Sequence, residues 1–445
     1  MEIVIIGGIA AGMSAAAKAA RTNKEAVITV FEKENYISFG ACGLPYYLGN
    51  QFDDTSEMFA RTPAQMEAAG INLRLKHEVT RIDFTTKTVY ATNLETGEEV
   101  TKSYDRLMLA TGASPIKPPI DGIDASNVYS ITRVAAVKRL KESLPNYKNI
   151  VVIGGGFIGM EVADQLVAQG KSVRIIEATD AMMRVPFDNE FSEKLKDAIT
   201  EIGVDVHLDE RVERFVQTNN TVTQVQTTKG MYDADAVIYA IGFKPNTEFL
   251  QDSALEKLKN GAIVIDKYGQ TSIPDVFAAG DCVAVPHRLL GQAYIPLATT
   301  ANKVGRIVGT NIALDKEQWI AYVGALGSSS IKAGEYEAAS TGLTEKQAKE
   351  AGFDYKTTCI QTNNHSNYYT KQEKIMIKLV YDAKTYVLYG AQLFGKNETV
   401  LRATAFSTAI HAGVTTKELG FVDFAYAPPF ASTWEAINVA ANTAK

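Results

Sequence analysis

The sequence has few cysteines, and they lie far apart. Only Cys42, Cys282 and Cys359 occur in 445 residues. This spacing excludes a small disulfide-stabilised scaffold and fits a compartment that keeps thiols reduced. Histidine is also scarce, and the five histidines show no spacing typical of metal ligands: His77, His207, His287, His365 and His411. We therefore expect no metal site.

The chain also lacks segments that would place it in or across a membrane. No apolar run reaches the roughly 20 residues needed to span a bilayer. The N-terminus, Met1–Ile6, has no basic start or long apolar stretch, and it predicts a buried strand rather than a signal peptide. The formal net charge is −6, with no basic cluster that would indicate nucleic acid or an anionic membrane as partner. These absences predict a cytoplasmic protein.

Cys42 has no second cysteine near it. A redox disulfide would need another sulfur close by, but Ile37 and Tyr47, five residues to either side, supply none. If Cys42 does redox chemistry, its oxidised form must pair with something outside the chain, either a small thiol in a mixed disulfide or oxygen in a sulfenic acid. A helix expected to start at Gly43–Tyr47 would favour the reactive thiolate. The alternative is a small buried hydrophobic residue, which is the role we expect for Cys282 and Cys359.

A complete dinucleotide-binding pattern lies in residues 149–177. A strand at Asn149–Ile153 leads into Gly154, Gly156 and Gly159, which match G-x-G-x-x-G, and a helix and second strand follow, ending at Glu177. Such glycines let a pyrophosphate approach the helix N-terminus, and the glutamate can accept hydrogen bonds from the adenosine ribose. A carboxylate there repels a 2′-phosphate, and the three residues that follow offer no Arg or Lys. The pattern therefore favours NADH over NADPH.

A less complete copy of this pattern stands at the N-terminus. A strand at Glu2–Ile6 leads into Gly7 and Gly12, and the next strand ends at Glu32, but Ile9 occupies the central glycine position. Alone, this loop fits a dinucleotide site or a chance turn about equally well.

Two distant strand ends strengthen the dinucleotide interpretation. One strand leads into Thr111 and Gly112, and another, Val276–Ala279, leads into Gly280 and Asp281. Doubly wound sheets bind ligands at the carboxyl ends of their strands. A dinucleotide held at one end by Glu32 and at the other by Asp281 would explain both features.

Together these motifs resemble the single-cysteine FAD-dependent pyridine nucleotide–disulfide oxidoreductases, a group that holds CoA-disulfide reductases, NADH oxidases and NADH peroxidases. The resemblance covers nearly the whole length, including the S-F-x-x-C-G-L-P-Y-Y run and Tyr426–Phe430. It implies an α/β fold with two doubly wound dinucleotide-binding domains, as in glutathione reductase, and a C-terminal α+β dimerisation domain. The implied boundaries are 1–113 with 245–320 for FAD, 114–244 for NAD(H) and 321–445 for dimerisation in a homodimer.

The resemblance also implies the cofactors and the residues that hold them. FAD and NADH would be bound, with coenzyme A as a candidate third ligand. The residues implied for FAD are Gly7, Gly12, Glu32, Lys33, Thr111, Gly112 and Asp281. Those implied for NAD(H) are Gly154, Gly156, Phe157, Gly159, Glu177 and Gly242. Phe157 would shield the flavin face until nicotinamide enters.

Within this group the chain most resembles the CoA-disulfide reductases. The Cys-Gly-Leu-Pro-Tyr-Tyr run fits them, although Ala41 stands where that subgroup usually has Asn, at an expected contact with CoA. Family oxidases and peroxidases often carry a His in the first glycine loop, and residues 7–12 contain none, which lowers the peroxidase interpretation. The alternative of an NADH oxidase, which reduces O2 to water or H2O2 through a Cys42 sulfenate, stays open. A flavoprotein that carries electrons to a protein partner is a third alternative, but it would not need a reactive thiol.

Two tyrosines are implied to take part in catalysis. Tyr368 and Tyr426 resemble tyrosines that reach the neighbouring subunit's active site, where each can donate a proton to a thiolate leaving group. The alternative is a pair of half-buried interface tyrosines. In the implied reaction NADH supplies two electrons, the Cys42 thiolate attacks the next disulfide, and one thiol leaves with a proton.

Overall fold

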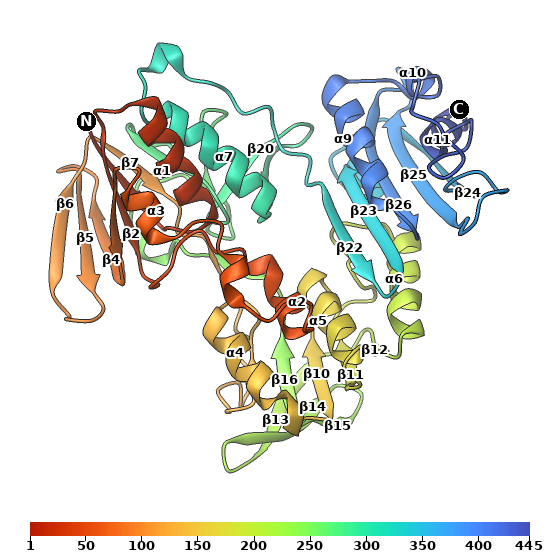
Figure 1. The fold of residues 1–445 in the computed structure, drawn as a ribbon, viewed down its shortest axis with the longest axis horizontal. Helices are drawn as coiled ribbons and strands as arrows, with labels where there is room; N and C mark the ends of the chain where they lie inside the picture. Colours follow the sequence, from red (N-terminus) through yellow and green to blue (C-terminus); the bar gives the residue numbers. More distant parts are fainter. The chain divides into compact units, whose positions relative to one another are not determined.

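The computed structural model describes residues 1–445, which form two compact units (Figure 1). Unit 1 consists of Met1–Gly43, Asp54–Pro115 and Phe243–Ala325. Unit 2 consists of Leu44–Asp53, Ile116–Gly242 and Leu326–Lys445. None of the helices combines the length and the apolar character required to span a bilayer.

Unit 1 is built on a five-stranded parallel sheet with the order β19-β7-β1-β2-β3. Its strands are β1 (Glu2–Ile6), β2 (Val27–Glu32), β3 (Ile71–Leu75), β7 (Arg106–Leu109) and β19 (Val276–Ala278). Ile3, Val4 and Ile5 are fully buried, as expected for a central strand covered on both faces. The order places the ends of β1, β7 and β19 side by side, and these are the strands that lead into the glycine-containing turns.

Two helices of unit 1 cross in close contact beside this sheet, α1 (Ala10–Thr22) and α7 (Ala298–Asn311) (Figure 1). A Cβ atom added at Gly305 would lie 2.6 Å from the Ala11 carbonyl oxygen, and one at Gly309 would lie 2.4 Å from that of Ala15. The glycines of α7 therefore allow the two backbones to touch, which fixes the helix that follows the first glycine loop.

Smaller elements complete unit 1. An antiparallel sheet contains β4 (His77–Asp83), β5 (Thr88–Asn93) and β6 (Glu99–Ser103), and β8 (Ala113–Pro115) pairs with β17 (Phe243–Pro245). A third small sheet contains β18 (Ile263–Val264), β20 (Val283–His287) and β21 (Gly291–Tyr294). The remaining helical elements are α3 (Pro63–Glu67), η1 (Ala41–Gly43), η2 (Thr55–Met58), η4 (Glu248–Leu250) and η5 (Lys316–Gln318).

The first part of unit 2 repeats the parallel architecture, with the sheet order β12-β11-β10-β16-β9. Its strands are β9 (Val128–Tyr129), β10 (Asn149–Ile153), β11 (Ser172–Ile176), β12 (Asp205–His207) and β16 (Ala236–Tyr239). An antiparallel sheet contains β13 (Val212–Thr218), β14 (Thr221–Thr227) and β15 (Met231–Asp233). The helices are α2 (Leu44–Leu48), α4 (Val134–Ser143), η3 (Leu144–Asn146), α5 (Phe157–Val167) and α6 (Asn189–Glu201).

The C-terminal part of unit 2 is an antiparallel sheet with the order β22-β23-β26-β25-β24, flanked by helices. The strands are β22 (Ser329–Ala333), β23 (Tyr336–Gly342), β24 (Tyr355–Asn363), β25 (Lys374–Asp382) and β26 (Leu388–Gly395). The helices are α8 (Glu345–Glu350), η6 (Val400–Arg402), α9 (Ala403–Ala412), α10 (Thr416–Leu419) and α11 (Ala436–Asn442). Two parallel sheets with glycine turns and a separate α+β segment confirm the predicted fold class.

Candidate cofactor and redox sites

The first glycine loop is shaped by contacts that only glycine permits. Gly7 has φ +104°, and a Cβ atom at Gly12 would lie 1.8 Å from the Gly7 carbonyl oxygen. The Glu32 carboxylate, 6% exposed, accepts hydrogen bonds from the backbone N–H of Gly8 at 2.6 Å and of Glu34 at 2.8 Å. The acid at the end of β2 is thus fixed against the loop at the start of α1.

The second glycine loop repeats this arrangement in unit 2. Gly154 has φ +106°, and a Cβ atom at Gly159 would lie 2.0 Å from the Gly154 carbonyl oxygen. The Glu177 carboxylate accepts hydrogen bonds from the backbone N–H of Gly155 at 2.7 Å and of Thr179 at 2.7 Å. Each loop therefore presents a cradle for a pyrophosphate next to an anchored carboxylate for a ribose.

The departure of the first loop from the full glycine pattern does not alter its fold. Ile9 has φ −95° and Gly156, at the equivalent position, has φ −85°, so neither backbone requires glycine. A Cβ atom at Gly156 would meet nothing within 4 Å. The central position is therefore unconstrained by the protein itself, which is why Ile9 and Gly156 are compatible with the same loop.

Asp281 lies beyond β19 with a carboxylate that accepts no hydrogen bond from the chain. Burial raises the pKa of this carboxyl, and only its backbone carbonyl has a partner, the Tyr294 hydroxyl at 3.1 Å. The residue is half-buried, and a carboxylate with no donor from the chain is open to the hydroxyl groups of a ligand. Beside it, beyond β7, Asn246 holds the backbone carbonyls of Thr111 and Gly112 at 2.9 Å each. The glycine cradle and the unsatisfied Asp281 carboxylate fit the pyrophosphate and ribityl hydroxyls of FAD.

The other predicted cofactor residues lie at the edges of these two loops. Lys33 is exposed, and its ammonium lies 4.0 Å from a carboxylate oxygen of Glu78. This is a contact away from the glycine loop. Phe157 is the first residue of α5 and is half-buried. Gly242, with φ +113°, follows β16 beside the second loop, where Gly154 packs against the Ala240 carbonyl oxygen.

The Cys42 segment is attached to the first glycine loop. The Ser38 N–H donates to the Gly8 carbonyl oxygen at 2.9 Å, and the Gly40 N–H donates to that of Met58 at 2.8 Å. Cys42 follows in η1, is exposed, and forms no disulfide. The helix expected just after it is α2, which begins at Leu44.

The other two cysteines are placed differently. Cys282 is fully buried, with its sulfur 3.7 Å from the Leu109 carbonyl oxygen and 3.5 Å from that of Ala279, and burial raises its pKa. Cys359 lies on β24 in unit 2 and is exposed, so the buried role expected for it is wrong. Neither forms a disulfide, so Cys42 is the one cysteine that is both exposed and attached to a glycine loop.

Comparison with known proteins accounts for this arrangement. Residues 1–305 match the family described as pyridine nucleotide-disulphide oxidoreductase, and residues 328–437 match its dimerisation domain. This chain belongs to that family. The membership confirms an NAD(P)H-dependent flavoprotein oxidoreductase that uses FAD, and it confirms the predicted C-terminal dimerisation domain.

Full-length relatives of this oxidoreductase carry two kinds of name. The chain is 36% identical to an NADH oxidase of Enterococcus faecalis, over 100% of this chain and 99% of that protein. It is 35% identical to an NAD(P)H coenzyme A polysulfide/persulfide reductase of Pyrococcus horikoshii, over 100% and 98%. Its structure matches a water-forming NADH oxidase from Lactobacillus brevis bound to NADH, with TM-score 0.95 and 32% identity, over 100% and 98% of the two chains.

The two tyrosines predicted from the sequence meet in the C-terminal part of this oxidoreductase. The hydroxyl oxygens of Tyr368 and Tyr426 lie 3.1 Å apart, and both side chains are exposed. Hydrogen bonds from Tyr368, Thr433 and Ser366 lower the pKa of Tyr426. The pair is therefore accessible, and a lowered pKa makes Tyr426 a better proton donor than an ordinary tyrosine.

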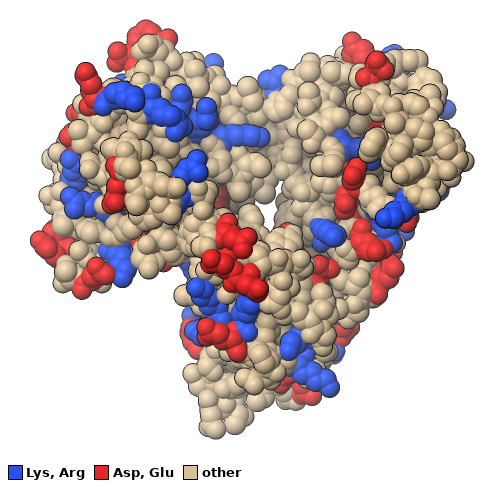
Figure 2. All heavy atoms as spheres, in the orientation of Figure 1, with Lys and Arg blue, Asp and Glu red and all other residues tan.

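A cavity lined by basic side chains lies beside α1 in unit 1. Its volume is about 520 Å³, and its lining includes Arg21, Lys24, Arg61 and Gln65. Figure 2 shows Lys and Arg side chains gathered over the part of unit 1 in which α1 and α7 lie. Arg61 joins Arg21 in this lining although it lies 40 residues further along the chain, so no local pattern in the sequence indicates the cavity.

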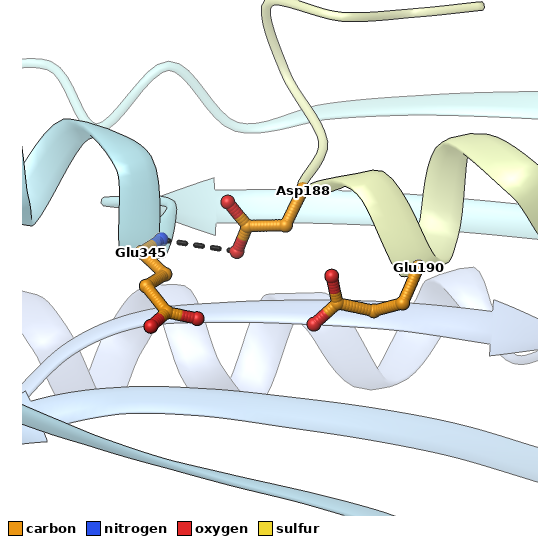
Figure 3. A group of neighbouring side chains, drawn as sticks. All are labelled: Asp188, Glu190 and Glu345. Atoms are coloured by element: carbon orange, nitrogen blue, oxygen red, sulfur yellow. Dashed lines mark hydrogen bonds between the residues drawn. The ribbon is translucent and has the colours of Figure 1, made fainter. Parts of the chain in front are cut away.

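Three carboxylates gather in unit 2, but a lysine fills the space between them. The ammonium of Lys378, 4% exposed, lies 3.0 Å from Asp188, 2.5 Å from Glu190 and 2.7 Å from Glu345. Figure 3 shows the three acids, with the Glu345 N–H donating to the Asp188 carboxylate at 3.0 Å. This cluster, the Lys378 network, is an internal ion network between α6, α8 and β25 and not a metal site.

Glu161 is a half-buried carboxyl on α5 that no sequence motif singled out. It accepts a hydrogen bond from the Tyr46 hydroxyl at 3.2 Å. Burial raises its pKa from 4.5 to about 7, the nearby charge of Asp164 adds to the increase, and the Tyr46 hydrogen bond opposes it. The folded protein therefore binds this proton more tightly than the unfolded chain does.

We expect the stability of the Glu161→Gln variant, relative to wild type, to increase as the pH rises. Between pH 4.5 and about 7 the folded state holds more protons than the unfolded state, so the wild-type protein loses stability, by roughly 3 kcal/mol once Glu161 is ionised. The amide does not titrate and avoids this loss. Thermal midpoints of both proteins at about pH 5 and pH 8 measure the difference. Glu142→Gln, an exposed carboxylate on α4, is the control. Equal pH dependence of Glu161→Gln and wild type would contradict the prediction.

Proposed function

We propose that this oxidoreductase uses NADH to reduce CoA disulfide, or a related small disulfide or persulfide, through the single redox cysteine Cys42. The observation that carries the proposal is the placement of Cys42, which is exposed on a segment bonded to the first glycine loop at Ser38. No second cysteine occupies a comparable place, so the oxidised partner of this sulfur has to come from outside the chain. A relative named a coenzyme A polysulfide/persulfide reductase over the full length supports this reading.

The cofactors are proposed to occupy the two cradles. FAD would be held by Gly7, Gly12, Glu32, Lys33, Thr111, Gly112 and Asp281, and NADH by Gly154, Gly156, Phe157, Gly159, Glu177 and Gly242. FAD bound in this way supplies two-electron transfer between NADH and sulfur. The proposed domain boundaries are 1–113 with 245–320 for FAD, 114–244 for NAD(H) and 321–445 for dimerisation.

The protein's own side chains then perform the sulfur chemistry. The Cys42 thiolate attacks one sulfur of CoA disulfide, which forms a mixed disulfide and expels one CoA thiolate. The departing sulfur takes a proton from Tyr426, assisted by Tyr368, or from water. Two electrons that originate in NADH, with a proton, cleave the mixed disulfide, release the second CoA thiol and restore the Cys42 thiolate. Each turnover thus converts one disulfide, one NADH and one proton from solvent into two thiols and NAD⁺.

The basic cavity beside α1 supports coenzyme A as the thiol carrier. Arg21, Lys24 and Arg61 line it, and guanidinium and ammonium groups are the usual partners of phosphate. The cavity belongs to unit 1, as Cys42 does. A small thiol without phosphates would not pair with these basic side chains.

The second candidate function is an NADH oxidase. A 36% identical relative of the same length carries that name, and an exposed cysteine is compatible with a sulfenate that resolves peroxide to water. The absence of histidine in residues 7–12 sets this chain apart from the peroxide-handling pattern of the resemblance. We further propose a cytoplasmic homodimer, in which Tyr368 and Tyr426 serve the partner's Cys42.

The acceptor is tested by measuring NADH oxidation with purified holoenzyme under two conditions. Anaerobic turnover that depends on added CoA disulfide is the expected result. Turnover only in aerated buffer, with no response to the disulfide, would establish the oxidase instead. Titration of free thiol with a chromogenic disulfide after each reaction adds a second readout, because the reductase should produce two thiols for each NADH consumed.

A further inference from the structure

An arginine stands close to the proposed adenosine ribose site of NADH, on the loop that follows β11. The three residues after Glu177 contain no basic side chain, but Arg184 lies further along the same loop. In folds of this type an arginine near the ribose accommodates the 2′-phosphate of NADPH. The presence of Arg184 beside a site whose carboxylate favours NADH therefore needs an explanation.

Both ends of this loop are tied to the second glycine cradle. At one end, the Thr179 N–H and hydroxyl donate to the same Glu177 carboxylate oxygen, at 2.7 and 2.8 Å. At the other end, the Met183 N–H donates to the Gly155 carbonyl oxygen at 2.9 Å. Asp180 follows the first anchor directly and Arg184 follows the second. Both charged side chains are therefore placed at the rim of the cradle.

Asp180 and Arg184 form an ion pair across the loop. Their side chains are 55% and 44% exposed, and an exposed pair of this kind contributes little to stability. The ion pair instead limits how readily the Arg184 guanidinium can bind a phosphate, because that guanidinium is already bonded to Asp180. The carboxylate of Asp180 adds a second negative charge, beside that of Glu177, against a 2′-phosphate.

We propose that Asp180 enforces the preference for NADH by holding Arg184 in this ion pair. The inference rests on the proposed placement of the nucleotide at the second glycine loop. Asp180 is a positioning residue, since it acts through Arg184 and not by touching NADH. Without its carboxylate, Arg184 becomes the phosphate-binding arginine that the site otherwise lacks, and the enzyme accepts NADPH.

The test is Asp180→Asn, which removes the charge and keeps the shape of the side chain. The ratio of kcat/KM for NADPH to that for NADH should rise about 2- to 5-fold, the size of one exposed ion pair. The change should appear in the KM for NADPH, with kcat nearly unaltered. Calorimetric titration with 2′,5′-ADP and with 5′-AMP gives a readout without catalysis, and only the 2′-phosphorylated nucleotide should bind more tightly.

Two further variants distinguish the release of Arg184 from a general effect of removing negative charge. Asp180→Asn combined with Arg184→Met should lose the gain, and a double variant that keeps it would overturn the role of Arg184. Asp209→Asn removes another exposed carboxylate next to the loop, where the Asp209 N–H donates to the Thr179 carbonyl oxygen at 2.9 Å. An equal gain from this control would also overturn the proposal, as would the absence of any gain in Asp180→Asn.

The nucleotide site itself is tested separately with Glu177→Ala. A weaker affinity for 5′-AMP and a higher KM for NADH would place the ribose at Glu177, whatever Asp180→Asn does. If Glu177→Ala changes neither quantity, the placement of the nucleotide is wrong and the inference fails with it. If Glu177→Ala has its effect and Asp180→Asn has none, only the ion-pair device fails.

Discussion

Cys42→Ser is expected to abolish disulfide reduction, with kcat falling by at least about 10³-fold, as when a catalytic nucleophile is removed. A serine hydroxyl cannot form the mixed disulfide, so the acceptor half of the reaction has no entry point. The residues that cradle FAD and NADH are unchanged in this variant. Bleaching of the flavin absorbance by NADH under anaerobic conditions should therefore proceed as in wild type. Rapid mixing with CoA disulfide after bleaching measures the lost step.

The matched control is Cys359→Ser. Cys359 is exposed on β24 and is distant in sequence from the glycine loops, so its replacement should leave turnover with CoA disulfide within about twofold, as for a surface substitution. Full disulfide turnover by Cys42→Ser would show that the disulfide is reduced without a protein sulfur. Loss of NADH-dependent bleaching in Cys42→Ser would instead show that this residue acts before the sulfur chemistry.

Lys378→Met should destabilise unit 2 by about 3–5 kcal/mol, because it leaves the buried Asp188 carboxylate without its cation. Asp188, 7% exposed, is the most affected, and it retains only the Gln392 amide at 2.6 Å and backbone donors of α8. Burial lowers the pKa of Lys378, but its carboxylate partners outweigh burial and raise the pKa above its ordinary value. Urea unfolding measures this loss as a lower free energy for the transition in which the C-terminal sheet unfolds.

The effect of Lys378→Met should depend on pH with a definite sign. Burial acts to raise the pKa of Asp188, but the Gln392 amide, the Glu345 N–H and Lys378 hold it below 3.8. This carboxylate therefore stabilises the wild-type fold above pH 3.8, and the contribution is lost as the pH falls through the folded pKa. The deficit of the variant should accordingly be largest near neutral pH and shrink in acid.

The control for this variant is Lys346→Met, on α8 in the same part of the chain. Lys346 is exposed and lies 4.0 Å from Glu350, so its loss should change the free energy of unfolding by less than about 1 kcal/mol. Similar losses in Lys346→Met and Lys378→Met would mean that the Lys378 network adds no more than an ordinary surface pair.

Short sequence patterns were sufficient to predict the strands and glycine loops, whose structure depends mainly on neighbouring residues. The strands at Glu2–Ile6 and Asn149–Ile153 have the predicted bounds, because each is a short apolar run bounded by a glycine turn. The placement of Glu32 and Glu177 beside the glycine loops could be predicted because their distance from the glycines is fixed by the β-α-β unit. The predicted domain boundaries and the roles assigned to individual residues stay predictions until the variants are measured.

Features that depend on distant pairings left no such signal. Lys378 meets Glu190 across 188 positions, and nothing in the sequence around either residue indicates the other. The raised pKa of Glu161 arises from its burial in the fold. The first glycine pattern carried less signal than the second because Ile9 replaces a glycine where φ is −95°, a value that does not require glycine.

Glu32 and Glu177 are both held by backbone N–H groups of their own loops, which are contacts that the chain itself supplies. Immobilising a glutamate side chain costs up to about 1.5–2 kcal/mol of conformational entropy. In this protein that cost is met when the chain folds, and nucleotide binding does not have to meet it again. Both cradles are therefore preorganised, and the affinity of each site should reflect the contacts of the ligand with little loss to the ordering of these two acids.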